Sequence, residues 1–402
     1  MVNVKFFKKA LSNPLVHLLS ILIVITICHS KFSPGMVRFF LTISVCLREL
    51  LIFVLPFLLF SFVAVALSAI PKEGMFFVLG LMLVVMMSNF LNILISGAVG
   101  FSILSAAEAY AMPEANVPIV PIFALHLPQV AETIHALFAG VIVGFINSLY
   151  PNKYVSFILR SMHYIVLQFM KKFFVPMLPV FVGGFLLKLF SEGRMAGFLE
   201  RNTGICLEMC GFLWIYLTLW LLLAASFKTI RAKEIFRNAF PAIVTAFSTM
   251  SSAAALPLSL EAAEKNTKDK VLADAVMPLT LNFHMVGDTI VVPIMAMIVL
   301  LAFNHPLPGI LDFVMFGVFF VLNKFAGGGV PSGTIMVTVP VLKEYMGFDD
   351  TMIAFIIAFY GIMDPIATSG NVAANNFFVI IFQKMRNFMK KRFFYMKEIV
   401  CD

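Results

Sequence analysis

Apolar stretches long enough to cross a lipid bilayer recur from one end of this sequence to the other, and no other feature restricts the fold as strongly. The first two cover residues 15–30 and 49–70, and a helix needs about 20 apolar residues to cross the hydrocarbon core. Of all residues, 61% are hydrophobic and only 12% are charged, whereas roughly a quarter of a soluble domain is charged. We therefore expect an all-α polytopic membrane protein surrounded by lipid.

The basic residues lie between the apolar stretches and not on one face with interleaved aromatic residues. The net charge of +8 therefore does not indicate a nucleic-acid partner. The loops that carry most of the Lys and Arg residues share one side of the expected topology with both ends of the chain. By the positive-inside rule this side is cytoplasmic, so we expect both termini in the cytosol and an even number of full crossings.

Full crossings are predicted for eight ranges, at 15–31, 49–70, 75–106, 119–149, 157–190, 206–229, 274–303 and 351–386. Two further segments, 234–270 and 306–348, are too apolar for loops, and runs of small residues with proline interrupt them near 251–257 and 327–333. Glycine and proline together remove helix propensity and a backbone donor. We expect two re-entrant helical hairpins that enter from opposite faces, which is typical of a binding site between inverted repeats. The alternative is that the small residues only allow close helix packing.

Four segments carry more specific patterns. Residues 246–257 read AFSTMSSAAALP, residues 278–289 read PLTLNFHMVGDT, residues 326–338 read AGGGVPSGTIMVT and residues 363–376 read MDPIATSGNVAANN. In order and spacing they resemble the first hairpin, seventh helix, second hairpin and last helix of the dicarboxylate/amino acid:cation symporter family, the glutamate transporter homologues. The usual family patterns are AFSTSSSATLP for the first hairpin, PLGATINMDGT for the seventh helix and DPFRTMVNVTGD for the last helix.

The resemblance implies a secondary active transporter of the elevator type that forms a homotrimer in the cell inner membrane. It implies scaffold parts at 1–70 (helices 1 and 2) and 111–195 (helices 4 and 5, with the trimer contacts). The transport parts would be 71–110 (helix 3) and 196–402, which holds helices 6, 7 and 8 and both hairpins, the second hairpin serving as the extracellular gate. The expected partner is a small solute, and we expect no cofactor other than a sodium ion or a proton as coupling ion.

The last predicted helix carries polar groups on one stripe, because Asp364, Thr368 and Asn371 follow one another at helical spacing. An unpaired carboxylate in the membrane costs at least roughly 2.5 kcal/mol, so Asp364 is a functional candidate, with a structural hydrogen-bonded aspartate as the alternative. The resemblance implies that Asp364 receives the α-amino group of the solute and that the other two lie beside it. The hairpins would bind a carboxylate through the serines of the first hairpin and the backbone of the second, that is, through Ser251, Ser252, Gly329, Val330 and Pro331.

One departure from the family pattern concerns the solute. Ala367 stands where relatives that carry acidic solutes have an arginine, and no other basic residue is an obvious replacement. The sequence therefore favours a small neutral amino-acid-like solute over aspartate or glutamate. The alternative function is a degenerate member that binds solute without coupled transport, or a passive channel. An enzyme is not expected, since G-x-S-x-G and H-E-x-x-H motifs are absent.

The cation positions of the family are also altered. His284 replaces an asparagine, Val286 replaces an aspartate ligand and Asn375 replaces the aspartate of the last helix, although sodium prefers oxygen ligands. A site of backbone carbonyls near Met285 is one interpretation, and proton coupling is another, because histidine has an ordinary pKa of about 6.5 and Asp288 follows four residues later on a continuous helix. In a third, His284 fills the cation void with a fixed hydrogen bond. The candidates for cation or proton coupling are His284, Met285, Asp288, Asn371 and Asn375.

Overall fold

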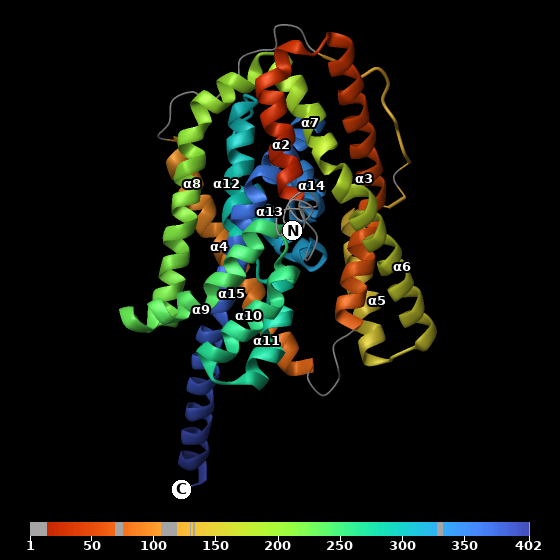
Figure 1. Ribbon diagram of the computed structural model, residues 1–402. Helices are drawn as coiled ribbons and strands as arrows, with labels where there is room; N and C mark the ends of the chain where they lie inside the picture. The colour runs from red at the N-terminus through yellow and green to blue at the C-terminus, as the bar shows by residue number, and fades with distance from the viewer. Residues whose placement is uncertain are drawn as a thin grey trace, which may run out of the picture.

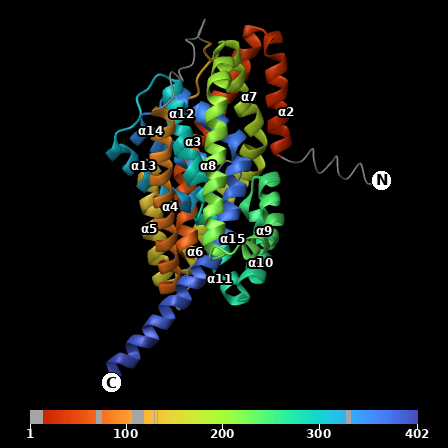
Figure 2. The same ribbon diagram turned by 90° about the vertical axis from the view of Figure 1, so that its left-hand side faces the viewer.

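The computed structural model describes residues 14–68, 75–105, 119–128, 130–131, 133–327 and 333–401. Every regular element within these ranges is helical, as predicted. The helices form an elongated bundle, and the C-terminal part of α15 projects beyond it (Figure 1, Figure 2). In chain order the elements are α2 (Pro14–Cys28), η1 (His29–Lys31), α3 (Pro34–Ser68), α4 (Met75–Ser105), α5 (Thr133–Leu149), α6 (Lys153–Phe169), η3 (Met170–Phe174), α7 (Val175–Ser191), α8 (Arg194–Ala224), α9 (Thr229–Thr249), α10 (Ser252–Thr267), α11 (Lys270–Phe283), α12 (Val286–Ala302), α13 (Ile310–Gly327), α14 (Gly333–Met346) and α15 (Asp350–Cys401).

Several of these helices are suited to a membrane. Within the described ranges, five are long and apolar enough to cross a bilayer, and one bent pair would make a sixth. Large apolar side chains also point outward: Phe157, Ile165 and Ile215 are 71%, 66% and 66% exposed. Lipid favours such a surface and water does not. The fold is therefore that of a helical polytopic membrane protein, and the count of eight crossings stays a prediction.

One part of the bundle is organised around α3, which packs against α5, α6 and α7 (Figure 1). Gly140 and Gly144 lie one turn apart on α5 and face α3. A Cβ atom added at Gly140 would lie 2.8 Å from the carbonyl oxygen of Phe60, and one added at Gly144 would lie 2.8 Å from that of Ala64. Small residues allow two helix backbones to approach this closely, so α3 and α5 form a tightly packed pair.

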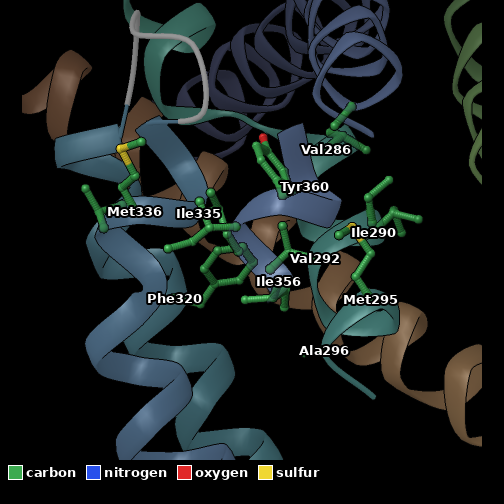
Figure 3. Packing of buried hydrophobic residues seen from close by; sticks show 14 of the residues in the cluster. Val286, Ile290, Val292, Met295, Ala296, Phe320, Ile335, Met336, Ile356 and Tyr360 are labelled. Atoms are coloured by element: carbon green, nitrogen blue, oxygen red, sulfur yellow. The ribbon is translucent and has the colours of Figure 1, made fainter. Parts of the chain in front are cut away.

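The other part is organised around α15, against which α8, α9, α10, α11, α12 and α14 pack. The core here is apolar. Figure 3 shows Phe320, Ile335, Val292 and Ile356 gathered on one side of Tyr360, whose hydroxyl oxygen lies at the end away from them. This arrangement places the hydroxyl oxygen of Tyr360 at the edge of an apolar cluster, where it needs a hydrogen-bond partner.

The first predicted hairpin is a helical hairpin in the fold. α9 ends at Thr249, and the next residue, Met250, has a left-handed backbone with φ of 51°. Ser251 then caps α10, because its Oγ accepts the backbone N–H of Ala254 over 3.3 Å. The far ends of the two arms are joined by a hydrogen bond of 2.7 Å from Asn238 Nδ2 to Asn266 Oδ1, so the arms run antiparallel.

The arms of the second predicted hairpin, α13 and α14, also pack against each other as antiparallel helices. Asn323 Nδ2 donates to the carbonyl oxygen of Val337 over 2.9 Å. Further from the tip, the rings of Phe319 and Tyr345 stack with centroids 5.0 Å apart. Three predicted binding residues between the arms lie outside the described residues, namely Gly329, Val330 and Pro331.

The predicted crossing at 119–149 is wrong in its first half, because the helix α5 begins only at Thr133. Pro121 and Pro128 each lack the N–H that a helix needs. The described residues before α5 form an irregular segment that runs beside α3 (Figure 1). It is held there by polar contacts such as the 2.8 Å hydrogen bond from the backbone N–H of Ile122 to Thr42 Oγ1.

The predicted crossing at 157–190 is not one straight helix. The π-helical turn η3 joins α6 to α7, and the two stretches Lys153–Phe174 and Pro179–Ser191 are bent by 52°. Pro176 and Pro179 near the start of α7 remove backbone donors, which accounts for the bend. The range 49–70 is the second half of a longer helix, α3, which begins at Pro34; the basic residues of its first half conceal it from a search for apolar runs.

Candidate functional site

The predicted seventh helix is broken in its middle. α11 ends at Phe283 and α12 begins at Val286, while His284 has φ and ψ of −91° and 89° and Met285 has −112° and 68°. The prediction that His284 and Asp288 share one helical face is therefore wrong. Four-residue spacing places side chains together only on a continuous helix, and here His284 lies in the break while Asp288 lies in α12.

The side-chain amide of Asn89 on α4 stabilises the break. Asn89 Nδ2 donates to the carbonyl oxygen of Phe283 over 2.6 Å, and Asn89 Oδ1 accepts the backbone N–H of Met285 over 3.3 Å. These are backbone groups that an unbroken helix would pair with itself, and buried backbone groups need partners. Asn89 is only 1% exposed, so its amide replaces helical hydrogen bonds inside the protein.

Polar side chains follow one face of α15 opposite this break. All are buried, with at most 6% exposed, and they occur at intervals of three or four residues: Tyr360, Asp364, Thr368, Asn371 and Asn375. We call this set the α15 stripe. Within it, Thr368 Oγ1 donates to Asp364 Oδ1 over 2.6 Å. The stripe unites four predicted site residues with Tyr360, which sequence reasoning missed because an aromatic residue in an apolar run is usually core.

Asp288 is the most contacted acidic group of the site. It lies in the first turn of α12 and is 1% exposed. Tyr360 donates its hydroxyl hydrogen to Asp288 Oδ1 over 2.5 Å, while Thr334 Oγ1 and Asn371 Nδ2 donate to Oδ2 over 2.9 and 3.0 Å. A helix N-terminus also favours a negative charge. Asp288 thus joins the starts of α12 and α14 to the α15 stripe.

The start of α12 lies directly against the backbone of α15. A Cβ atom at Gly287 would lie 2.0 Å from the carbonyl oxygen of Ala367 and 3.0 Å from the backbone nitrogen of Asn371. Such distances leave no room for any side chain. Glycine at 287 is therefore what lets Asp288 reach the stripe, and Ala367 is itself fully buried beside this contact.

Lys324 is a second residue that sequence reasoning missed. It lies in the last turn of α13 and is 1% exposed. Its Nζ lies 3.6 Å from Asp288 Oδ2 and 4.0 Å from the centroid of the Phe320 ring. The signal was available, since a charged residue within an apolar run is a functional candidate.

Asn375 fixes the orientation of the groups at the break. Its Nδ2 donates to the backbone carbonyl oxygens of His284 and Asn371, each over 2.9 Å. Because carbonyl oxygens only accept hydrogen bonds, the amide nitrogen must face them. Asn375 Oδ1 then lies 3.3 Å from His284 Nδ1, and this nitrogen must carry the hydrogen. The contact pattern therefore assigns His284 as the Nδ1–H tautomer.

The rest of the His284 ring also contacts uncharged groups. Nε2 lies 2.9 Å from Ser88 Oγ and accepts its hydroxyl hydrogen in this tautomer. The rings of Phe378 and Trp220 lie with centroids 4.6 and 5.4 Å away. Among the described residues these contacts are uncharged, and His284 is 0% exposed, which favours a neutral imidazole over a charged one.

The predicted residues of the first hairpin lie at the start of α10, where Ser251 and Ser252 are half-buried. The hydroxyl of Ser251 serves as the helix cap. α10 packs on α15, with a hydrogen bond of 3.3 Å from Asn376 Nδ2 to Ser259 Oγ. Met285 Sδ lies 3.6 Å from Thr334 Oγ1, at the start of α14.

The fold and these contacts define a multi-pass membrane protein in which a buried polar cluster meets an interrupted helix, an architecture typical of secondary transporters. The chain belongs to the sodium:dicarboxylate symporter family, which it matches over residues 15–385. This is a family of transporters, in agreement with the prediction that the chain is not an enzyme.

A segment of 137 residues, 34% of this chain, is 28% identical to a Caenorhabditis elegans protein named as a sodium-dependent excitatory amino acid transporter, glt-3. The aligned segment spans 25% of the length of that protein. The family is described as one of sodium:dicarboxylate symporters, and the apolar helices of this chain agree with a multi-pass membrane protein.

Proposed function

We propose that the protein is a secondary active transporter, a symporter or exchanger, for a small neutral amino-acid-like solute. The observation that carries the proposal is the α15 stripe, which faces the break between α11 and α12 in a chain of a transporter family. Buried polar side chains are costly among apolar helices unless they serve a purpose. Irregular backbone at membrane depth is likewise tolerated where protein or ligand satisfies it.

The charges at the site support a neutral solute. The Asp364 carboxylate would receive the α-amino group, and the starts of α10 and α14 would attract the α-carboxylate, because helix N-termini bind anions. A side-chain carboxylate would need a further cation. Ala367 supplies none, and Lys324, the one buried lysine or arginine that the described ranges show, is already paired with Asp288.

The residues at the sodium positions of the family also differ from the family pattern. The resemblance implies that the carbonyl of Asn371 touches a cation, yet this oxygen and that of His284 accept N–H groups of Asn375. The positive N–H groups of Asn375 thus face both carbonyl oxygens where a sodium ion would need oxygen ligands, and Val286 offers no ligand. The residues present therefore do not fit a sodium ion between the break and Asn371. Backbone carbonyls near Met285 are the remaining place for one.

For His284 we propose a structural role, as a neutral group that holds the break by hydrogen bonds. Its two nitrogens contact a hydroxyl and an amide, and two aromatic rings enclose it. A proton carrier would need a neighbour that stabilises the charged form. The observed contacts support the third interpretation of the sequence, in which the ring fills a cation void.

The movement that we propose is of the elevator type. The grouping of α5, α6 and α7 around α3 supports a scaffold, and the grouping of α8 to α12 and α14 around α15 supports a transport part. In this proposal the hairpins α9–α10 and α13–α14 are re-entrant from opposite faces, the second is the extracellular gate, and eight helices cross the inner membrane with both termini in the cytosol. Three copies associate through the scaffold.

Two measurements test the function. A thermal-shift screen against neutral and acidic amino acids and dicarboxylates, each with sodium, potassium or neither, should identify a neutral amino acid, because a ligand of the folded state raises its melting temperature. Uptake of that solute into proteoliposomes should follow. The altered sodium positions favour one alternative, a protein that binds solute without coupled transport, and binding with no flux under any ion gradient would establish it.

A further inference from the structure

Lys324 and Asp288 form an ion pair that the proposed function leaves unexplained. Both side chains are buried, with 1% and 2% exposed, and their charged atoms lie 3.6 Å apart. They also come from opposite kinds of helix end, since Lys324 lies in the last turn of α13 and Asp288 in the first turn of α12. Each charge therefore has the sign that its helix dipole favours.

The position of the ammonium group is the one that a free cation would take. In transporters with interrupted helices, the C-terminal ends of half-helices coordinate the coupling cation, and Lys324 places a positive charge at such an end. An ammonium group carries the same charge as a sodium ion, but it is covalently attached and cannot exchange with the solution. We propose that Lys324 is a tethered cation which holds the place of an exchangeable monovalent cation at Asp288.

The surroundings of Asp288 would suit a sodium ion if the lysine were removed. Thr334 Oγ1, Tyr360 Oη and Asn371 Nδ2 all lie within 3.0 Å of the carboxylate. The two hydroxyl oxygens can turn their lone pairs toward a cation, and together with the carboxylate they give the hard ligands that sodium prefers. Lys324 Nζ lies 3.6 Å from the same carboxylate.

The test exchanges the tethered cation for a free one. Three proteins are compared: wild type, Lys324→Ala, and the double variant Lys324→Ala with Asp288→Asn. Their melting temperatures are measured without solute in sodium, potassium or N-methyl-D-glucamine chloride of equal ionic strength. Lys324→Ala should gain a stabilisation specific to sodium that wild type lacks, roughly 1–2 °C at about ten times its Kd. The double variant has no carboxylate and should not gain it.

A sodium response of Lys324→Ala equal to that of wild type would overturn the proposal and leave the pair a structural contact. If Lys324→Ala cannot be purified, the neutral pair Lys324→Met with Asp288→Asn decides instead. This double variant should respond to sodium as wild type does. If the double variant loses a sodium response that wild type has, Asp288 already binds free sodium in wild type. The inference rests on the proposed function only where it concerns ion coupling. Because the test contains no solute, a negative result leaves the transport proposal standing.

Discussion

Asn371 and Asp288 bind each other twice. Asn371 Nδ2 donates to Asp288 Oδ2 over 3.0 Å, and the backbone N–H of Asp288 donates to Asn371 Oδ1 over 3.2 Å. The pair joins the first turn of α12 to the middle of α15, and both side chains are at most 3% exposed. A solute bound to the α15 stripe therefore lies beside a carboxylate whose position is fixed from two helices.

The first prediction concerns Asp364. Asp364→Asn removes the charge that we assign to the α-amino group of the solute but keeps the size of the side chain. Affinity should fall roughly 10- to 100-fold, because a charged hydrogen bond contributes about 1.5–3 kcal/mol. Isothermal titration with the solute found in the screen measures this. Asp312→Asn, the same change at an exposed position of α13, is the matched control, and equal affinities of both variants would remove the role from Asp364.

The second prediction concerns the choice of solute. Ala367→Arg should allow glutamate or aspartate to raise the melting temperature, because it returns a cation to the position where relatives with acidic solutes carry one. Ala367 is fully buried, so the larger side chain also strains the packing. Ala367→Met adds similar length without charge and separates the two effects. If the two variants respond alike to acidic solutes, the position of the solute side chain has been misassigned.

A third prediction restores an oxygen ligand at Asn375. Asn375→Asp removes the two N–H groups that the carbonyl oxygens of His284 and Asn371 now accept, so three oxygen groups would face one another. They should repel unless a cation lies between them. We expect a lower melting temperature than wild type in N-methyl-D-glucamine and a specific recovery in sodium.

Asn376→Asp is the control for this change, since Asn376 is equally buried but its Nδ2 donates to Ser259 Oγ and to the carbonyl oxygen of Val372. It should be destabilised without any recovery in sodium. Recovery of both variants to the same extent would mean that sodium acts elsewhere in the protein.

The sequence was sufficient for the parts of this site that follow one helical period. Asp364, Thr368 and Asn371 lie on a single predicted helix, so their common face could be derived from spacing alone. Both hairpins could be located as well, because glycine, serine and proline interrupt apolar runs there. Local chemistry determines such features, and they do not depend on distant segments.

The rest depended on contacts between distant segments. His284 and Asp288 were assigned to one helical face because the break between α11 and α12 is stabilised by Asn89, nearly 200 residues earlier in the chain. Tyr360 and Lys324 sit in apolar runs, and only the folded chain brings both to Asp288. Spacing within a segment cannot reveal a partner in another segment.

The fourth prediction concerns pH. His284 is held as a neutral ring, and a glutamine carboxamide offers one donor and one acceptor group in its place. His284→Gln should leave the pH dependence of uptake unchanged between about pH 5 and 8, the range in which histidine normally titrates. The free energy of unfolding should fall by about 1–3 kcal/mol. His305→Gln changes an exposed histidine and serves as control; a pH profile flattened only in His284→Gln would establish proton coupling at this residue.

Counterflow in proteoliposomes tests the central claim most directly, that the α15 stripe carries a neutral amino-acid-like solute through the membrane. Vesicles loaded with unlabelled solute are diluted into trace labelled solute with no ion gradient. We predict a transient accumulation of label above equilibrium with wild type and none with Asp364→Asn. Label that only approaches equilibrium would indicate a channel, and label that never enters despite binding would indicate a non-transporting protein; either result would contradict the account.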